Sequence, residues 1–371
     1  MTSATDQNQN DRSNPVLDTL DSKIFLINRY SVLDSPYRWA RDLLSILGER
    51  ATLINLKFNL RQPIIADSGI IFDGKFVGLP FLNYLLRDIA FSNARKYIER
   101  VSRDIGHVII HYTNQFSGVL NIPGVGDIVN VQDSPYYVEN SSFKQRLYLR
   151  SLYNSLKKQQ HIVTNTNHLK NELTEFGFEG EITTLYLPYS PRFRRLSLEK
   201  EALRKKLALP YNKKLVLSVS TDSARKNLQM VKKAVDELGS DFRLVRVGTP
   251  LGDSITFKAV DDESLNELYN ACDVLLFPSL YEGFGLPIVE AFASGLPVVT
   301  SDIPTIREVA GDAAALSDPR NAEDIKDAIK FALNNSDNFA KKGIERSLKF
   351  SFDGFKKGII ALYKKIEREN S

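Results

Sequence analysis

Two acidic residues, Glu282 and Glu290, enclose a glycine-containing loop and the start of a predicted helix, with seven residues between them. Glu282 lies on the loop and Glu290 about one turn inside the helix. Carboxylates accept hydrogen bonds well, and the neighbouring hydroxyls of a sugar or a ribose offer paired donors. Glu290 alone would equally fit a structural role, because acidic residues near a helix N-terminus complement the helix dipole. The pair together indicates a site for sugar hydroxyls.

A basic pair, Arg225 and Lys226, lies between the predicted strand Lys214–Val219 and a helix predicted over Asn227–Leu238. Two cations and the free N–H groups of a helix start converge there, which suits a diphosphate. The alternative is two exposed basic residues with no ligand. That alternative is less favoured, because a cation at a helix N-terminus is unfavourable unless an anion is present.

The segment around the acidic pair predicts the elements that position it. Val274–Phe277 is a short apolar run typical of a strand buried in a parallel sheet. Gly283 and Gly285 permit a tight turn, and Pro287 suits the first turn of a helix. Pro297–Thr300 predicts the next buried strand. The unit is strand, glycine loop, helix and strand, which places the loop at the carboxyl edge of the sheet, where ligands bind.

The stretch Glu282-Gly-Phe-Gly-Leu-Pro-Ile-Val-Glu290 closely resembles the signature of family 4 of the retaining glycosyltransferases, and the resemblance continues through Pro319. These enzymes have the GT-B fold. The resemblance implies that Glu282 touches the donor sugar and that Glu290 holds the nucleotide ribose. It also implies that backbone of the loop lies against sugar and phosphate, at Gly283, Phe284, Gly285 and Leu286.

The resemblance extends to the basic pair and shows departures there. Family members use such a pair to grip the donor phosphates, which implies this role for Arg225 and Lys226. Ser220 stands where a glycine is usual, and Thr221 where some members have an arginine. We nevertheless include Ser220 and Thr221 among the donor-binding residues.

A second departure lies in the first half of the chain, where many members have a His-Asp pair whose histidine faces the reacting sugar. Here the pair is Gln132 and Asp133. Glutamine keeps a hydrogen-bonding side chain but cannot titrate, so it excludes acid–base catalysis at that position. The loop after the first strand also lacks the glycine pair of the family. Arg38 and Trp39 could replace it, although a single tryptophan more often packs in a core.

Length and composition favour two domains of an α/β protein. The chain has 371 residues, too many for one ordinary core, with 43% hydrophobic and 25% charged residues. We predict two Rossmann-like doubly wound domains that face each other across a cleft. The expected division is a disordered tail over 1–22, an acceptor domain over 23–190 and a nucleotide-sugar-binding domain over 191–351. A C-terminal helix over about 352–368 should complete the first domain.

Several partner classes are disfavoured by the sequence. The net charge is only +4 and no nucleic-acid motif is present. The four histidines lack the spacing of a metal site, so we predict no metal and no cofactor beyond a nucleotide sugar as co-substrate. The single cysteine, Cys272, should be a buried structural residue. No apolar run is long enough to cross a bilayer and the N-terminus does not resemble a signal peptide, so we expect a cytoplasmic protein.

The amphipathic basic stretch Phe143–Leu156 fits either a helix on anionic lipid, at the cytoplasmic face of the membrane, or an ordinary surface helix. Overall we expect a retaining, metal-independent hexosyltransferase that uses GDP-mannose or UDP-glucose and a glycan or lipid-linked acceptor. The alternative is a noncatalytic GT-B subunit that binds a nucleotide sugar or a glycan, which the departures at Gln132 and Ser220 would fit. An epimerase or phosphorylase with this fold fits the motif less well.

Overall fold

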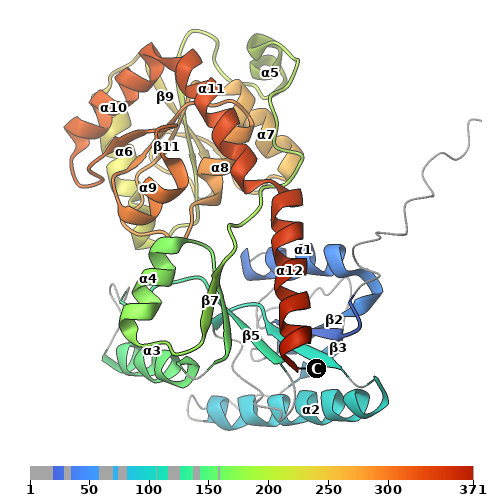
Figure 1. Ribbon diagram of the computed structural model, residues 1–371. Helices are drawn as coiled ribbons and strands as arrows, with labels where there is room; N and C mark the ends of the chain where they lie inside the picture. The colour runs from blue at the N-terminus through green and yellow to red at the C-terminus, as the bar shows by residue number, and fades with distance from the viewer. Residues whose placement is uncertain are drawn as a thin grey trace, which may run out of the picture.

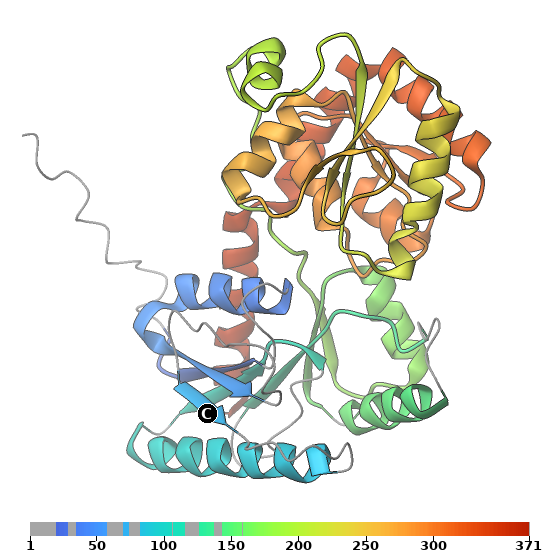
Figure 2. The same cartoon turned by 180° about the vertical axis from the view of Figure 1, so that it is seen from behind.

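The computed structural model describes residues 20–28, 35–57, 70–73, 82–105, 107–115, 126–136, 143–157 and 159–370. These residues form two lobes, each built on a parallel sheet with helices on both faces, stacked one above the other in Figure 1 and seen from behind in Figure 2. The predicted α/β class with two doubly wound units is confirmed.

The first sheet has seven strands in the order β3-β2-β1-β4-β5-β6-β7, and all its strand pairs are parallel. Its strands are β1 (Lys23–Asn28), β2 (Ala51–Lys57), β3 (Ile70–Asp73), β4 (Val108–Tyr112), β5 (Gly126–Val131), β6 (His161–Thr164) and β7 (Glu181–Thr184). The helices between them are α1 (Ser35–Leu47), α2 (Leu82–Ile105), α3 (Phe143–Leu156) and α4 (Asn167–Phe176), with a 3-10 turn η1 (Gly48–Arg50).

Alternating side chains of β1 show why this sheet must be covered on both faces. Ile24 and Leu26 pack in one cluster with α1, whereas Phe25 and Ile27 pack in another with α2, α3 and α4. Successive side chains of a strand point to opposite faces, so an apolar run without polar alternation needs two helical layers.

The second sheet has six parallel strands in the order β10-β9-β8-β11-β12-β13. Its strands are β8 (Lys214–Val219), β9 (Phe242–Val247), β10 (Ile255–Phe257), β11 (Val274–Phe277), β12 (Val298–Ser301) and β13 (Ala315–Ser317). Its helices are α5 (Lys200–Lys206), α6 (Leu228–Glu237), α7 (Asp262–Ala271), α8 (Leu286–Ala293), α9 (Pro304–Ala310), α10 (Ala322–Asn334) and α11 (Ser336–Ser347), with 3-10 turns η3 (Ala224–Lys226) and η4 (Leu348–Phe350). As in the first sheet, α7 and α8 share one hydrophobic cluster with the strands and α6 and α10 share another.

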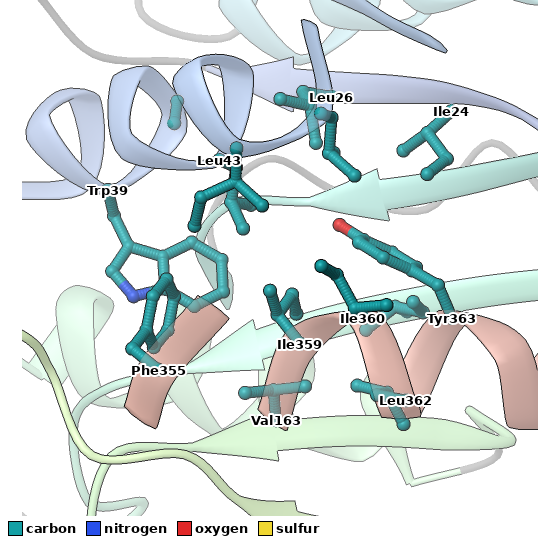
Figure 3. Close-up of a cluster of buried hydrophobic side chains, with 14 of the residues drawn as sticks. Ile24, Leu26, Trp39, Leu43, Val163, Phe355, Ile359, Ile360, Leu362 and Tyr363 are labelled. Atoms are coloured by element: carbon teal, nitrogen blue, oxygen red, sulfur yellow. The ribbon is translucent and has the colours of Figure 1, made fainter. Parts of the chain in front are cut away.

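The last helix, α12 (Phe352–Asn370), leaves the second lobe and runs along the first one (Figure 1). Its buried stripe of Phe355, Ile359 and Leu362 packs with Trp39 and Val163 of the first lobe, as Figure 3 shows. Trp39 is therefore a core residue, 4% exposed. The side chain of Arg38 lies outside the described residues.

A buried histidine ties α12 to the first sheet. His111 of β4 lies 2.7 Å from the Tyr363 hydroxyl through Nδ1 and 3.0 Å from Asn130 Oδ1 through Nε2. Asn130 Nδ2 donates to the Thr113 carbonyl, which fixes its oxygen as the acceptor for His111. Burial lowers the pKa of His111 to about 4, so this histidine is neutral at neutral pH.

The N-terminal tail is shorter than predicted. The tail predicted over residues 1–22 is wrong at its end, because Leu20 is fully buried in the cluster that contains α12 and the Ser22 backbone N–H donates to Glu367. Residues 1–19 lie outside the described residues. In α3, the side chains from Phe143 to Tyr148 also lie outside them, so the alternative of a lipid-facing helix stays a prediction.

Candidate functional site

The predicted acid and the predicted basic pair meet in one cluster of ion pairs. Lys226 Nζ lies 2.5 Å from Glu282 Oε1, and Arg225 Nη1 lies 3.0 Å from Glu282 Oε2. Glu282 is only 4% exposed. Burial lowers the pKa of Lys226, and the charge of Glu282 opposes this shift. The two cations thus already have an anionic partner in Glu282. The sequence predicted instead that they bind a phosphate.

The basic pair is positioned by a short turn of its own. Arg225 and Lys226 belong to η3, and α6 begins only at Leu228 because Asn227 has a left-handed backbone with φ of 57°. The Asn227 side-chain amide donates to the carbonyls of Pro278 and Pro319, at 3.0 and 2.7 Å. This corrects the predicted helix start at Asn227, and it places the cations on a turn held against the second sheet.

The glycine loop forms much as predicted, with a different reason for each glycine. Gly285 has φ of +95° and directly precedes α8, whose first turn contains Pro287. Gly283 allows the backbone of the loop to approach the first lobe closely, because a Cβ there would lie 2.2 Å from the carbonyl oxygen of Gln132. Such a distance is far below contact, so only glycine allows the two lobes to meet at this point.

The side chain of Phe284 points into the core that joins the lobes. Its ring lies 6.3 Å from that of Tyr186 and 5.5 Å from that of Phe350, and it belongs to the hydrophobic cluster of α12. Leu286 packs partly against the same cluster. At Phe284, therefore, only backbone is available to a ligand.

Glu290 lies in α8 with a partner of its own. It is 4% exposed and accepts a hydrogen bond of 3.0 Å from the Tyr269 hydroxyl, whose ring is fully buried. Tyr269 therefore orients this carboxylate from α7.

The first lobe contributes the predicted pair Gln132 and Asp133 directly after β5. The Asp133 carboxylate accepts a hydrogen bond from Gln115 Nε2 at 3.0 Å. Burial raises the pKa of Asp133, and the neighbouring charge of Arg225 opposes the shift. Beside it, the Ser134 backbone N–H donates to the Tyr281 hydroxyl at 2.6 Å, across the boundary between the lobes. Gln132 and Asp133 thus lie next to the cluster of Glu282.

Ser220 and Thr221 follow β8 at the carboxyl edge of the second sheet. The Ser220 hydroxyl is buried without a hydrogen-bond partner, and Thr221 is exposed. The Ser220 carbonyl accepts from Arg246 Nη2 at 2.5 Å, and Arg246 Nη1 donates to the Ser218 and Val247 carbonyls. Arg246 is fully buried, and its guanidinium fixes the end of β8 through these hydrogen bonds.

Sequence analysis missed several polar groups of the site: Gln115, Ser134, Asn165, Ser223, Arg246 and Tyr281. The Ser223 hydroxyl is a further buried group without a partner, just before η3. Of these residues, Arg246 alone had a visible signal, a charge inside the otherwise apolar strand Leu244–Val247. A buried strand with one arginine indicates a specific partner at that position.

Comparisons with known proteins agree with this architecture. The family "Glycosyl transferases group 1" matches residues 199–349. O-antigen chain mannosyltransferase B of Escherichia coli is 28% identical over 241 residues, 58% of this chain and 63% of that protein. O-antigen chain mannosyltransferase RfbU of Salmonella typhimurium is 31% identical over 208 residues, 53% of this chain and 57% of that protein. The chain therefore matches about 60% of the length of these relatives.

Among solved structures, sucrose-phosphate synthase from Thermosynechococcus elongatus superposes with a TM-score of 0.77 at 17% identity, over 94% of this chain and all of that chain. Its likeness shows the fold, which is GT-B. Residues 199–349, which contain the acidic motif, thus match the group 1 glycosyltransferases, the family that the motif resembles.

Two further features concern ions and membranes. Among the described residues, no group of three or more His, Cys, Asp or Glu side chains is placed to hold a metal ion. Within the same part of the chain, none of the helices combines the length and apolar character that crossing a bilayer requires.

Cys272 is buried after α7, and burial raises its pKa to about 12, which excludes a thiolate nucleophile at neutral pH.

Proposed function

We propose that this protein transfers a hexose from a nucleoside diphosphate sugar to a hydroxyl of a glycan or lipid-linked acceptor, with retention of configuration and without a metal ion. The observation that supports this most is the cluster of Glu282, Arg225 and Lys226, which lies against Gln132 and Asp133 of the other lobe. Two buried hydroxyls without partners, those of Ser220 and Ser223, lie in the segment that leads to it.

In this proposal the donor replaces part of the ion-pair network. The diphosphate accepts hydrogen bonds from Arg225 and Lys226, and it takes over the role that the Glu282 carboxylate has in the structure. Glu282 then accepts from hydroxyls of the transferred sugar. Glu290, held by Tyr269, accepts from the ribose hydroxyls. The two cations stabilise the negative charge that develops on the diphosphate as it leaves.

The chemical step needs no protein nucleophile. The bond from the anomeric carbon to the diphosphate oxygen breaks, and the acceptor oxygen bonds to the same face of that carbon. The acceptor proton passes to an oxygen of the leaving phosphate. Gln132 cannot titrate, so this proton route does not depend on an acid or base at that position.

We also propose a division of work between the lobes. Residues 23–190, completed by the helix at about 352–368, would bind the acceptor, and residues 191–351 would bind the donor. Hydrophobic clusters support this division, because α12 packs into the first lobe. Because these two relatives are mannosyltransferases, we propose mannose as the transferred sugar and GDP-mannose ahead of UDP-glucose as the donor to test.

A thermal-shift panel of GDP, UDP, GDP-mannose and UDP-glucose tests donor binding first, because a ligand that binds the native state raises Tm. Glu290→Ala should abolish most of that shift while Tm without ligand changes little. Transfer to a synthetic lipid-linked glycan, followed by NMR of the anomeric configuration, tests the reaction. An inverted product would contradict retention. Donor binding with no transfer to any acceptor would favour the noncatalytic sugar-binding subunit instead.

A further inference from the structure

We propose that Asn165 of the first lobe binds a hydroxyl of the transferred sugar and contributes to the choice of donor. This inference rests on the proposed function. Asn165 directly follows β6, whose register with β5 pairs Val131 with Thr164. Gln132 and Asn165 therefore leave the sheet side by side at the carboxyl edge that faces the second lobe.

Asn165 lies beside the glycine loop of the second lobe, which we call the donor loop. Its Nδ2 lies 3.6 Å from the position that a Cβ on Gly283 would take. Gly283 is the residue next to Glu282, which the proposed function assigns to the transferred sugar. The amide thus reaches across the boundary between the lobes, to the part of the loop nearest the reacting end of the donor.

The amide has unused hydrogen-bonding capacity. Asn165 is 4% exposed, and its Oδ1 is buried without a hydrogen-bond partner. A buried polar atom without a partner is unfavourable, and a ligand bound at the donor loop would supply the missing hydrogen bond. A sugar hydroxyl both donates and accepts, which matches an amide that has one acceptor oxygen and two N–H donors.

The backbone around Asn165 is fixed by contacts between the lobes. The next residue, Thr166, caps α4 by accepting a hydrogen bond from the Leu169 N–H. The Glu308 carboxylate of the second lobe accepts from the backbone N–H groups of Asn167 and His168, at 2.6 and 2.7 Å. Closure of the lobes therefore fixes Asn165 against the donor loop.

The test compares the affinity for a free nucleotide with the affinity for its sugar conjugate, by isothermal titration calorimetry on the full chain. We would use GDP with GDP-mannose, and UDP with UDP-glucose. Asn165→Ala should weaken the conjugate about 3- to 10-fold, the range expected for one neutral hydrogen bond, and leave the free nucleotide unchanged. Asn165→Leu keeps the branched shape of the side chain, so it should give the same result with a smaller effect on folding.

Asn167→Ala is the matched control, because that asparagine lies two residues on at the same boundary and its side-chain amide donates to the Tyr186 hydroxyl. It should leave the ratio of the two affinities unchanged. Deoxy-sugar conjugates identify the hydroxyl that Asn165 binds. The conjugate that lacks this hydroxyl should have the same affinity for the wild type and for Asn165→Ala. The wild type should bind a conjugate more tightly than its free nucleotide. If both Asn165 variants keep the wild-type ratio of these two affinities, this inference alone is overturned. A wild type that binds no nucleotide or conjugate would overturn the proposed function as well.

Discussion

The carbonyl oxygen of Gln132 and the α-carbon of Gly283 approach each other so closely that a side chain on Gly283 has no room: its Cβ would lie 2.2 Å from that oxygen. One residue belongs to the first lobe and the other to the motif of the second. The glycine therefore sets how closely the two halves of the candidate site approach.

Gly283→Ala should separate the lobes locally and reduce kcat/KM about 10- to 100-fold, because small displacements of catalytic groups are costly. Small-angle scattering should show a larger radius of gyration, with Tm little changed. Gly354→Ala is the control, since the nearest atom to its Cβ would be the Ser351 hydroxyl at 3.1 Å. An active Gly283→Ala protein with wild-type dimensions would contradict this prediction.

Glu282→Gln should destabilise the protein by about 3 kcal/mol, because it leaves the largely buried Lys226 ammonium and the half-buried Arg225 guanidinium without their carboxylate. Urea denaturation measures this loss. The double variant Glu282→Gln with Lys226→Met should regain part of it. Glu181→Gln, which removes an exposed partner of Lys365, is the control and should leave the free energy of unfolding close to the wild-type value.

Asp133→Asn should stabilise the protein at neutral pH. Burial raises the pKa of Asp133 above its ordinary value of 3.8, so the ionised carboxylate opposes folding once the pH exceeds that value. The gain in unfolding free energy should be absent below pH 3.8 and should grow as the pH rises through the folded pKa. Chemical denaturation of both proteins across pH measures it. A variant less stable than wild type at pH 7 would show that the charge stabilises the fold.

His111 should make the docking of α12 sensitive to acid. Burial lowers its pKa from 6.5 to about 4, so the unfolded chain binds the proton first as the pH falls. Stability from this group is complete above pH 6.5 and should be lost between 6.5 and about 4, by roughly 3 kcal/mol. His111→Gln should flatten that part of the profile.

The only tryptophan, Trp39, reports this change, because its ring lies 5.2 Å from that of His111 and 5.6 Å from that of Phe355 in α12. Its fluorescence follows acid unfolding in both proteins. Burial also lowers the pKa of His161, with the same sign, so an identical slope in His111→Gln would assign the acid sensitivity elsewhere.

Local patterns were sufficient for the elements near the site. The apolar runs at β1, β8 and β11 and the loop before α8 were predicted from residues that are adjacent in the chain. Short edge strands were not: β10 has three residues, all only partly buried, so its pattern is too weak to recognise.

Contacts across long separations could not be predicted either. Lys226 and Glu282 are 56 residues apart, and the parallel pairing of β8 with β11 brings the ends of these strands together. Sequence analysis therefore assigned phosphate to the cations and sugar to the acid, without the ion pair between them. Asn165 gave no signal in the sequence, because its position beside Gly283 depends on how the two lobes pack together.

The position of α12 has a consequence for biosynthesis. The first lobe begins at the start of the described chain, yet part of its core comes from Phe355, Ile359 and Leu362. Domains usually fold in turn as they leave the ribosome. Here the core of the nascent first lobe is complete only after the residues following Phe352 have been translated. Until then an apolar surface of the first lobe is exposed, and a chaperone could bind there.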